Sequence, residues 1–159
     1  MRIKENNFKY TYNVNGQLSG LRAGNSREDY KYDAGGRLLE WSTYHGNSTD
    51  PLIEKSIDYD SFENGDGEFS TSNRPHVWTY EADGYSVIYT YSYDTNDNIV
   101  SENVGGKTTT YGYDSANQLI RENNQAENRT WIWTYDNAGN IKSKKEYAYT
   151  TGALGSAIS

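Results

Sequence analysis

The chain has 159 residues, a formal net charge of −7, and 15 lysines and arginines that are scattered along it. An acidic chain without a basic patch argues against nucleic-acid binding and against an anionic membrane surface. The chain has no cysteine, which excludes disulfides and thiol chemistry. No apolar run approaches the roughly 18 residues that a membrane-spanning helix needs, so we expect no membrane insertion. The length fits one domain, or a piece of a longer protein.

The chain begins with a short motif that predicts a β-hairpin. Residues 10–18 read Tyr-Thr-Tyr-Asn-Val-Asn-Gly-Gln-Leu, and residues 30–38 read Tyr-Lys-Tyr-Asp-Ala-Gly-Gly-Arg-Leu. Two tyrosines two residues apart lie on one face of a strand. Asp33 then opens a turn whose amides its carboxylate can bind, and Gly36 provides the left-handed backbone that ends such a turn. Leu38 begins the return strand.

The middle of the chain fits this pattern less well. Residues 78–84, Trp-Thr-Tyr-Glu-Ala-Asp-Gly, fit the hairpin motif with Tyr80 and Gly84 at the tyrosine and glycine positions and Glu81 replacing the aspartate. The polar, glycine-containing stretch 61–74 predicts a surface loop. We expect residues 85–93, which have a tyrosine at nearly every second position, to form one long strand.

Three clear copies of the motif follow, at residues 91–99, 111–119 and 133–141. The second aromatic residue recurs after 20 residues (Tyr12 to Tyr32, Tyr93 to Tyr113) and after 22 residues (Tyr113 to Tyr135), a length that fits two strands and two turns. Where the glycine is missing, Asp97 and Asn117 replace it, and these residue types tolerate the left-handed region best. The motif residues with a structural role are Tyr12, Gly16, Tyr32, Asp33, Gly36, Tyr80, Gly84, Tyr93, Asp94, Tyr113, Asp114, Tyr135, Asp136 and Gly139.

These repeats predict an all-β array of antiparallel hairpins that forms a curved and twisted sheet. The hairpin units lie near 8–25, 28–45, 55–70, 76–105, 109–128 and 131–150. Residues 150–159 form a tail or a truncated next repeat, and Tyr147 with Tyr149 would start a further strand pair. The sheet would end in unpaired edges, which favour self-association.

The in-register motifs resemble the YD-repeat, or Rhs-repeat, family, which includes bacterial Rhs proteins, the C component of insecticidal Tc toxins and the animal teneurins. The resemblance covers about residues 8–150 and is weakest over 46–76. Residues 135–152 look like the repeats that precede the core region in wall-associated Rhs proteins of Gram-positive bacteria. The resemblance implies a β-shell that encloses a C-terminal toxin or carries an adhesive surface, in a secreted or cell-surface protein. The self-cleaving aspartate site of the family has no match in this chain.

Several residue clusters allow a second interpretation. The aromatic ladders, of which Trp131 and Trp133 are the best candidates, could bind a glycan or a surface receptor instead of packing the sheet. The repeated aspartates could be carboxylate pairs for hydrolysis, although a turn role explains their positions better. The acidic run 58–68 could hold calcium but does not match the spacing of an EF-hand loop, and this alternative stays open.

The sequence therefore predicts a structural wall segment of an Rhs-type shell, with the core and toxin of its own parent polypeptide as partners. The alternative is a carbohydrate- or protein-binding adhesion module. We expect no enzymatic activity and no cofactor, because the chain has two isolated histidines, His45 and His76, and no nucleophile, zinc or phosphate-binding motif.

Overall fold

The structure, a computed structural model, describes residues 8–63 and 69–159. Every regular element in this part of the chain is a β-strand, and each strand pairs with its sequence neighbours in antiparallel fashion wherever a pairing is defined. The expected all-β array of hairpins is thereby confirmed. Within these described ranges no helix is present that could cross a membrane.

The strands divide between two compact units, Met1–Ile88 and Tyr89–Ser159. β7, which covers the expected strand from Tyr85 to Tyr93, contributes to both units. Unit 1 also holds β1 (Phe8–Tyr12), β2 (Leu18–Ala23), β3 (Ser26–Tyr32), β4 (Leu38–His45), β5 (Ile53–Glu63) and β6 (Phe69–Ala82). Unit 2 also holds β8 (Ile99–Val104), β9 (Lys107–Tyr113), β10 (Leu119–Asn124), β11 (Arg129–Tyr135) and β12 (Ile141–Ala148).

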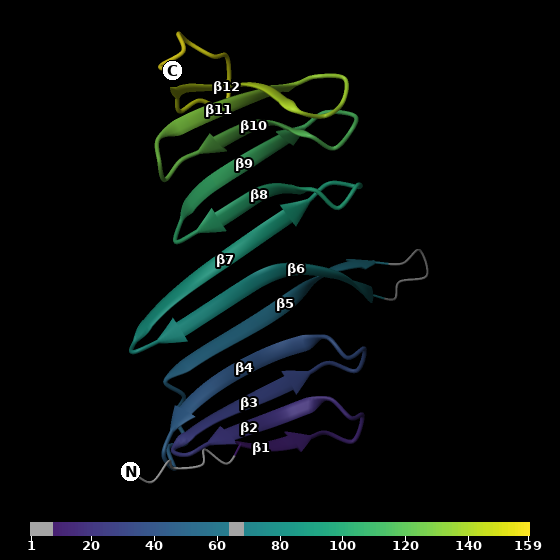
Figure 1. Cartoon of the computed structure of the whole chain (residues 1–159), viewed down its shortest axis with the longest axis vertical. Helices are drawn as coiled ribbons and strands as arrows, with labels where there is room; N and C mark the ends of the chain where they lie inside the picture. Colours follow the sequence, from purple (N-terminus) through teal and green to yellow (C-terminus); the bar gives the residue numbers. More distant parts are fainter. Residues whose placement is uncertain (1–7, 64–68) are drawn as a thin grey trace, which may run out of the picture. The chain divides into compact units, whose positions relative to one another are not determined.

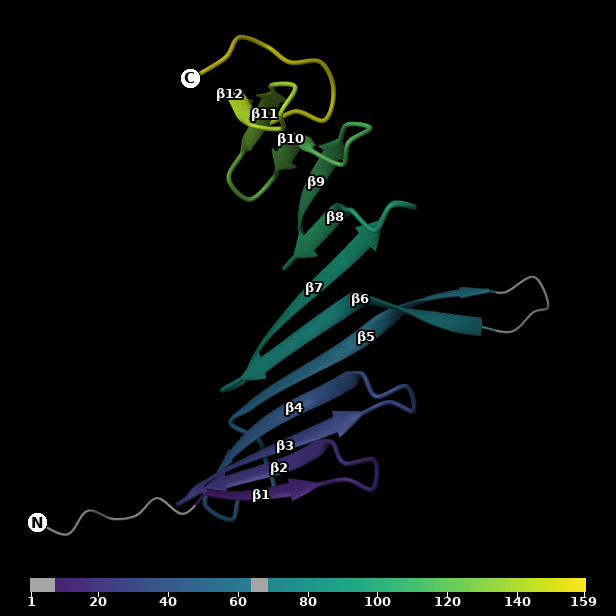
Figure 2. The same ribbon diagram turned by 45° about the vertical axis from the view of Figure 1, so that its right-hand side comes forward.

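Two kinds of turn alternate along each unit. In Figure 1 the turns that follow β1, β3, β9 and β11 lie at one end of their hairpins, and the turns that follow β2, β4, β8 and β10 lie at the other. The first kind carries the Tyr-x-Tyr-Asp motif, and Figure 2 shows these broader loops from another side. Each hairpin therefore has its motif turn at the same end as the other hairpins of its unit.

Two regions differ from the sequence prediction. Most of the stretch 61–74, expected as a loop, continues the long hairpin of β5 and β6, in which Ser61 pairs with Thr71. The loop was predicted from the polar composition of this stretch. The prediction was wrong because strand pairing uses backbone groups, which polar residues also have. Glu81 opens no turn but lies within β6, and the turn that follows consists of Asp83 and Gly84, both with positive φ. This two-residue turn belongs to the second kind.

Register gives each unit one aromatic face and one polar face. In unit 2, for example, Tyr111 lies opposite Glu122, which in turn lies opposite Trp131, and strand alternation places all three on one face. The aromatic face carries Tyr10, Tyr12, Tyr30, Tyr32, Trp41, Tyr59, Trp78 and Tyr80 in unit 1, and Tyr89, Tyr91, Tyr93, Tyr111, Tyr113, Trp131, Trp133 and Tyr135 in unit 2.

The described part of the chain has no buried hydrophobic side chain. The side chains with the least exposure are polar and lie on the polar face, namely Ser42 at 1% and Thr130 at 0%. Tyr147 also lies on the polar face, opposite Thr130, and belongs to β12, so it does not start a further aromatic strand pair as expected. Each unit is thus a single layer whose apolar face is only partly covered.

Candidate functional site

The motif aspartates bind the amides of their own turns. In the turn after β7, Asp94 Oδ1 accepts hydrogen bonds from the backbone amides of Asn96 (2.8 Å) and Asn98 (2.9 Å), and Asp94 Oδ2 accepts one from Asn98 Nδ2 (2.9 Å). The turn is closed by a backbone bond from the Asp97 amide to the Asp94 carbonyl. The carboxylate therefore provides hydrogen-bond acceptors for backbone amides that have no strand partner where the chain reverses.

The same geometry recurs in the other motif turns. Asp114 and Asp136 each accept hydrogen bonds, at about the same distances, from the backbone amides two and four residues later. Asp33 accepts a hydrogen bond from the backbone amide of Arg37 (2.8 Å) and forms an ion pair with the Arg37 guanidinium (2.6 Å). In the first turn an amide oxygen has this role, because Asn13 Oδ1 accepts the amides of residues 15 and 17. The motif needs an oxygen acceptor here, and not a charge.

Donors to a carboxylate stabilise its ionised form and lower its pKa. The backbone amide of Arg37 is the main cause of the lowered pKa of Asp33. The side-chain amides of Asn98 and Asn140 are the main causes of the lowered pKa of Asp94 and Asp136. These aspartates belong to separate turns, and each carboxylate binds donors of its own loop.

Left-handed residues end the motif turns. Gly16, Gly36 and Gly139 have φ between 79° and 88°, and Asp97 and Asn117 take the same region at 65° and 59°. At Gly36 a second constraint applies, because a Cβ atom would lie 3.2 Å from Gln17 Nε2, which donates a hydrogen bond to the Gly36 carbonyl. Gln17 belongs to the preceding motif turn, so this contact joins neighbouring hairpins.

A bulge follows every one of these turns. Ser92 pairs with Ser101 and Tyr93 with Ile99, so Val100 is left without an opposite residue. The same one-residue shift occurs in the hairpins β1–β2, β3–β4, β9–β10 and β11–β12. Bulges disrupt the local ladder and increase the twist of the strand, and the carbonyl that precedes the bulge can then bind a side chain.

The second tyrosine of a motif binds that carbonyl in the preceding hairpin, an arrangement that we name the tyrosine latch. Tyr113 Oη donates to the Ile99 carbonyl at 2.8 Å, and Tyr135 Oη donates to the Leu119 carbonyl at 2.7 Å. In unit 1, Tyr32 Oη donates to Leu18 O (2.8 Å). Tyr59 Oη, which lies on β5 outside these motif copies, donates to Leu38 O in the same way (2.9 Å). The latch explains why the motif contains tyrosine where phenylalanine would pack equally well.

Carboxylates also lie among the rings of the aromatic face. Tyr111 Oη donates to Glu102 (3.2 Å), and burial together with this negative charge raises the pKa of Tyr111. In unit 1, Tyr30 Oη binds Glu28, and burial with this hydrogen bond raises the pKa of Tyr30 to about 12. These pairs were not predicted from the sequence, because Tyr111 and Glu102 lie on different strands and Glu28 and Tyr30 are separated by one residue on the same strand.

The two tryptophans singled out from the sequence lie on β11 and share one lysine. Lys144 Nζ lies 5.2 Å from the ring centroid of Trp131 and 5.2 Å from that of Trp133. Both rings are half-buried. Glu146 lies opposite Trp131 and pairs with Arg129 at 2.5 Å. The rings thus form part of a charged cross-strand network, and cation–π contact covers part of their surface.

A hollow of about 230 Å³ lies on the aromatic face of unit 1, lined by Leu38, Trp41, Lys55, Ile57 and Trp78. Lys55 Nζ lies 5.3 Å from the Trp41 ring centroid and 5.7 Å from that of Tyr80. The hollow therefore offers apolar walls with one cation, which suits a planar or anionic group.

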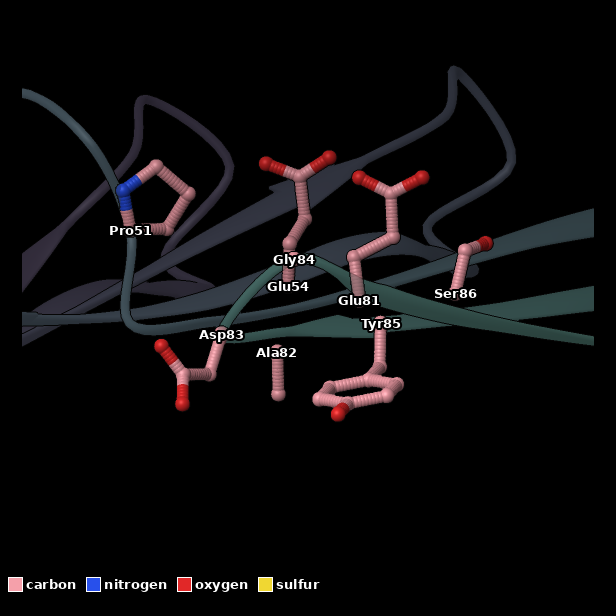
Figure 3. A pocket seen from close by; sticks show the side chains of 8 residues that line it. All are labelled: Pro51, Glu54, Glu81, Ala82, Asp83, Gly84, Tyr85 and Ser86. Atoms are coloured by element: carbon pink, nitrogen blue, oxygen red, sulfur yellow. The ribbon is translucent and has the colours of Figure 1, made fainter.

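A second hollow, of about 360 Å³, surrounds the turn between β6 and β7 (Figure 3). Glu54 and Glu81 lie opposite each other in the β5–β6 ladder, and their side chains point to the same side. The side chains of Asp83 and Tyr85 point to the other side. The carboxylates around this turn therefore do not converge on one point.

The remaining side chains that could bind a metal ion lie on different strands. His45 ends β4, whereas His76 lies within β6. The acidic run 58–68 falls partly outside the described residues, and within its described part Asp60 pairs with Arg74 at 2.8 Å. Residues 8–63 and 69–159 contain no group of three or more side chains that could hold a metal ion.

Comparison with known proteins agrees with these hairpins. The RHS Repeat family matches residues 93–124, which contain a motif turn, a bulge and the tyrosine of the next motif. A comparison with curated proteins finds no match. Among solved structures, the crystal structure of TcdB2-TccC3-TEV is similar with a TM-score of 0.67 at 20% identity, over 89% of this chain and 8% of that chain.

Two further structures are similar over 93% of this chain and 9% of theirs. The crystal structure of TcdB2-TccC3 without its hypervariable C-terminal region has a TM-score of 0.50 at 18% identity. The Photorhabdus luminescens Tc holotoxin pore has a TM-score of 0.49 at 16% identity. This chain therefore spans less than a tenth of the length of each of these three chains.

Motif, fold and comparison define the class of this molecule as an array of antiparallel hairpin repeats. In these repeats the tyrosine binds the preceding hairpin and the aspartate closes its own turn, and residues 93–124, which contain one such unit, match the RHS Repeat family.

Proposed function

We propose that this chain is a wall segment of a larger Rhs-type β-shell, secreted or displayed at a cell surface, that encloses or presents a C-terminal toxin or effector of the same polypeptide. It acts by forming a barrier, and it performs no catalysis. The observation that carries this proposal is that a single-layer sheet with no buried apolar side chain among its described residues is nonetheless joined from hairpin to hairpin.

Two features support a wall in preference to a free-standing domain. Large rings on the aromatic faces remain exposed, for example Tyr10 at 53% and Tyr85 at 77%, and a soluble domain normally covers such patches. The fold is similar to a small part of the much longer TcdB2-TccC3-TEV chain. Both features are expected of a segment whose aromatic face meets other parts of a large assembly.

Limited proteolysis of the parent polypeptide tests this proposal. If the repeats form a wall, the region that follows them should resist protease while the repeats are intact. The double variant Tyr113→Phe/Tyr135→Phe, which removes two latches, should increase cleavage of that region. Tyr89→Phe is the matched control, because Tyr89 lies on the same aromatic face and no described residue accepts a hydrogen bond from its hydroxyl. Equal cleavage in the presence and absence of the repeats would contradict the proposal.

A second candidate function is glycan or protein binding by the aromatic face. The apolar hollow around Lys55 and the half-buried rings of Trp131 and Trp133 favour it. A glycan array followed by Trp131→Ala, Trp133→Ala and Trp41→Ala distinguishes the two functions. Specific binding that one of these variants abolishes supports a binding module, and the absence of any binding supports the wall alone.

A further inference from the structure

Three cations form one row across the polar face of unit 1. Lys9 of β1 lies opposite Arg22 of β2, and Arg22 lies opposite Arg27 of β3. Strand alternation turns these side chains to the face opposite to the aromatic rings, and strand spacing makes the row roughly 10 Å long. The three positions are far apart in the sequence, so only the register reveals this row, which we name the basic row.

The basic row brings like charges to directly opposite positions, which destabilises an antiparallel pair. Other cations of unit 1 are offset by carboxylates. Lys31 pairs with Glu40 at 2.6 Å, and Arg37 pairs with the aspartate of its own turn. The side chains of Lys9 and Arg22, by contrast, are exposed, and neither forms an ion pair or a hydrogen bond with a described residue. These two cations therefore have no counter-charge in the described part of the chain.

The guanidinium of Arg27 is held in place by two neighbours. Its Cζ lies 3.8 Å from the ring centroid of Tyr44 on the opposite strand, and its Nε lies 3.0 Å from Asp29 Oδ2. This Nε is buried and, in spite of the ion pair, makes no hydrogen bond. No described residue accepts a hydrogen bond from the terminal nitrogens either. The group is thus pre-organised, while its terminal donors remain unused.

A hollow of about 210 Å³ lies at this place. All three members of the basic row line it, together with Thr11, Gly20 and Asp29. Gly20 is buried, and a Cβ atom there would lie 2.6 Å from Thr11 Oγ1, so glycine leaves the space between the neighbouring side chains open. Pockets for drug-sized ligands measure about 300–1,000 Å³. The hollow therefore suits a small ligand.

We propose that the basic row binds a small tetrahedral oxyanion with two negative charges, namely a phosphate group. Three cations and one carboxylate line the hollow, which leaves two positive charges for the ligand to neutralise. The terminal nitrogens of Arg27 donate hydrogen bonds to two of its oxygens, Arg22 provides a second guanidinium, and Lys9 provides a point charge.

Charge also distinguishes this ligand from other anions. A carboxylate has one negative charge and two oxygens, and would leave part of the basic row without a counter-charge. A long polyanion is disfavoured because the chain as a whole has a net charge of −7. The site belongs to the polar face of unit 1, and the proposal does not depend on the enclosing role.

Calorimetric titration of the 159-residue chain with inorganic phosphate, at about pH 8 and constant ionic strength, tests this proposal. We expect saturable binding of one phosphate. Arg22→Gln and Arg27→Gln should each weaken it about ten-fold or more, as expected for the loss of a charged hydrogen bond. Lys31→Gln is the matched control, because Lys31 lies on the same polar face of β3 but pairs with Glu40. It should bind phosphate like the wild type.

Thermal unfolding separates ligand binding from a structural role of Arg22. In phosphate-free buffer, Arg22→Gln should raise the unfolding midpoint, because it relieves the repulsion within the basic row. Addition of phosphate should raise the midpoint of the wild type more than that of Arg22→Gln, since a ligand of the folded state stabilises it. A lower midpoint of Arg22→Gln in both buffers would assign Arg22 a structural role and overturn the proposal.

Three further results would overturn it: no saturable binding, an equal affinity for acetate, or equal weakening by Lys31→Gln and Arg22→Gln. Titration with glucose 6-phosphate identifies the source of the phosphate group. Tighter binding than that of inorganic phosphate indicates a phosphate ester, and equal binding indicates the free ion. Circular dichroism of each variant verifies that the sheet is folded.

Discussion

The hydroxyl of Tyr135 donates a 2.7 Å hydrogen bond to the carbonyl of Leu119 in the preceding hairpin. The bond joins the two most regular positions of the repeat, the second tyrosine and the aliphatic residue after the turn. It also satisfies a carbonyl at the point where the β-bulge disrupts the ladder. Neighbouring hairpins are therefore joined by side chains as well as by their strand pairing.

Removal of one latch should destabilise the chain. Tyr113→Phe keeps the ring but deletes the donor to the Ile99 carbonyl, and the net loss of one such bond is about 0.5–1.5 kcal/mol. Urea unfolding followed by circular dichroism measures the change. Tyr12→Phe should leave the unfolding free energy of the 159-residue chain unchanged, because no described residue accepts a hydrogen bond from the Tyr12 hydroxyl. Equal effects of the two substitutions would contradict the latch.

The motif aspartates should make stability depend on pH in the acid range. The pKa values of Asp94 and Asp136 are lowered from 3.8 in the folded chain by their turn donors. Their contribution is thus fully present above about pH 4 and is lost as the pH falls through the lower folded pKa values. In Asp94→Asn/Asp136→Asn the unfolding midpoint should fall less steeply below pH 4 than in the wild type.

The first turn already shows that an asparagine fits this position, because Asn13 accepts the same two amides. The double variant should therefore fold at neutral pH. Parallel acid profiles of variant and wild type would show that the turn donors do not stabilise the ionised carboxylates.

Local chemistry explains which parts of the fold the sequence predicted. The turns of Asp33, Asp94 and Asp136 depend on residues within four positions of each other, so a single sequence contains all of their determinants. The left-handed replacement at Asn117 has the same local origin. Hairpins, motif turns and the all-β class could therefore be predicted.

Contacts across hairpins could not be predicted in this way. Tyr113 and Ile99 are 14 residues apart, and their bond becomes visible only when the bulge and the register are known. Glu81 resembles a turn-opening acid by its distance from Tyr80, but the chain reverses two residues later, at a two-residue turn. The spacing within the latch also varies, because Tyr135 and Leu119 are 16 residues apart and Tyr59 and Leu38 are 21 apart, so no constant distance in the sequence identifies the latch.

Gly36→Ala should cost more than Gly16→Ala, although both glycines hold the same turn position. Both have positive φ (88° and 79°), so each alanine is strained by about 1–2 kcal/mol. At Gly36 the new Cβ also lies 3.2 Å from Gln17 Nε2, whereas nothing lies within 4 Å at Gly16. The extra cost of Gly36→Ala should disappear when Gln17→Ala is added. Thermal unfolding of Gly36→Ala and Gly16→Ala, each with and without Gln17→Ala, measures this difference. An unchanged difference in the presence of Gln17→Ala would exclude crowding by Gln17.

Alkaline titration should detect the pair of Tyr30 and Glu28. Burial and the Glu28 carboxylate raise the pKa of Tyr30 from 10.0 to about 12, so the folded state favours the protonated phenol. The corresponding stability is present below pH 10 and is lost as the pH rises through about 12. Glu28→Gln removes the charge and the strong acceptor, so phenolate absorbance should appear at lower pH. Glu40→Gln is the control, because Glu40 lies on the polar face and pairs with Lys31. An identical phenolate titration for Glu28→Gln and Glu40→Gln would mean that burial alone protects Tyr30.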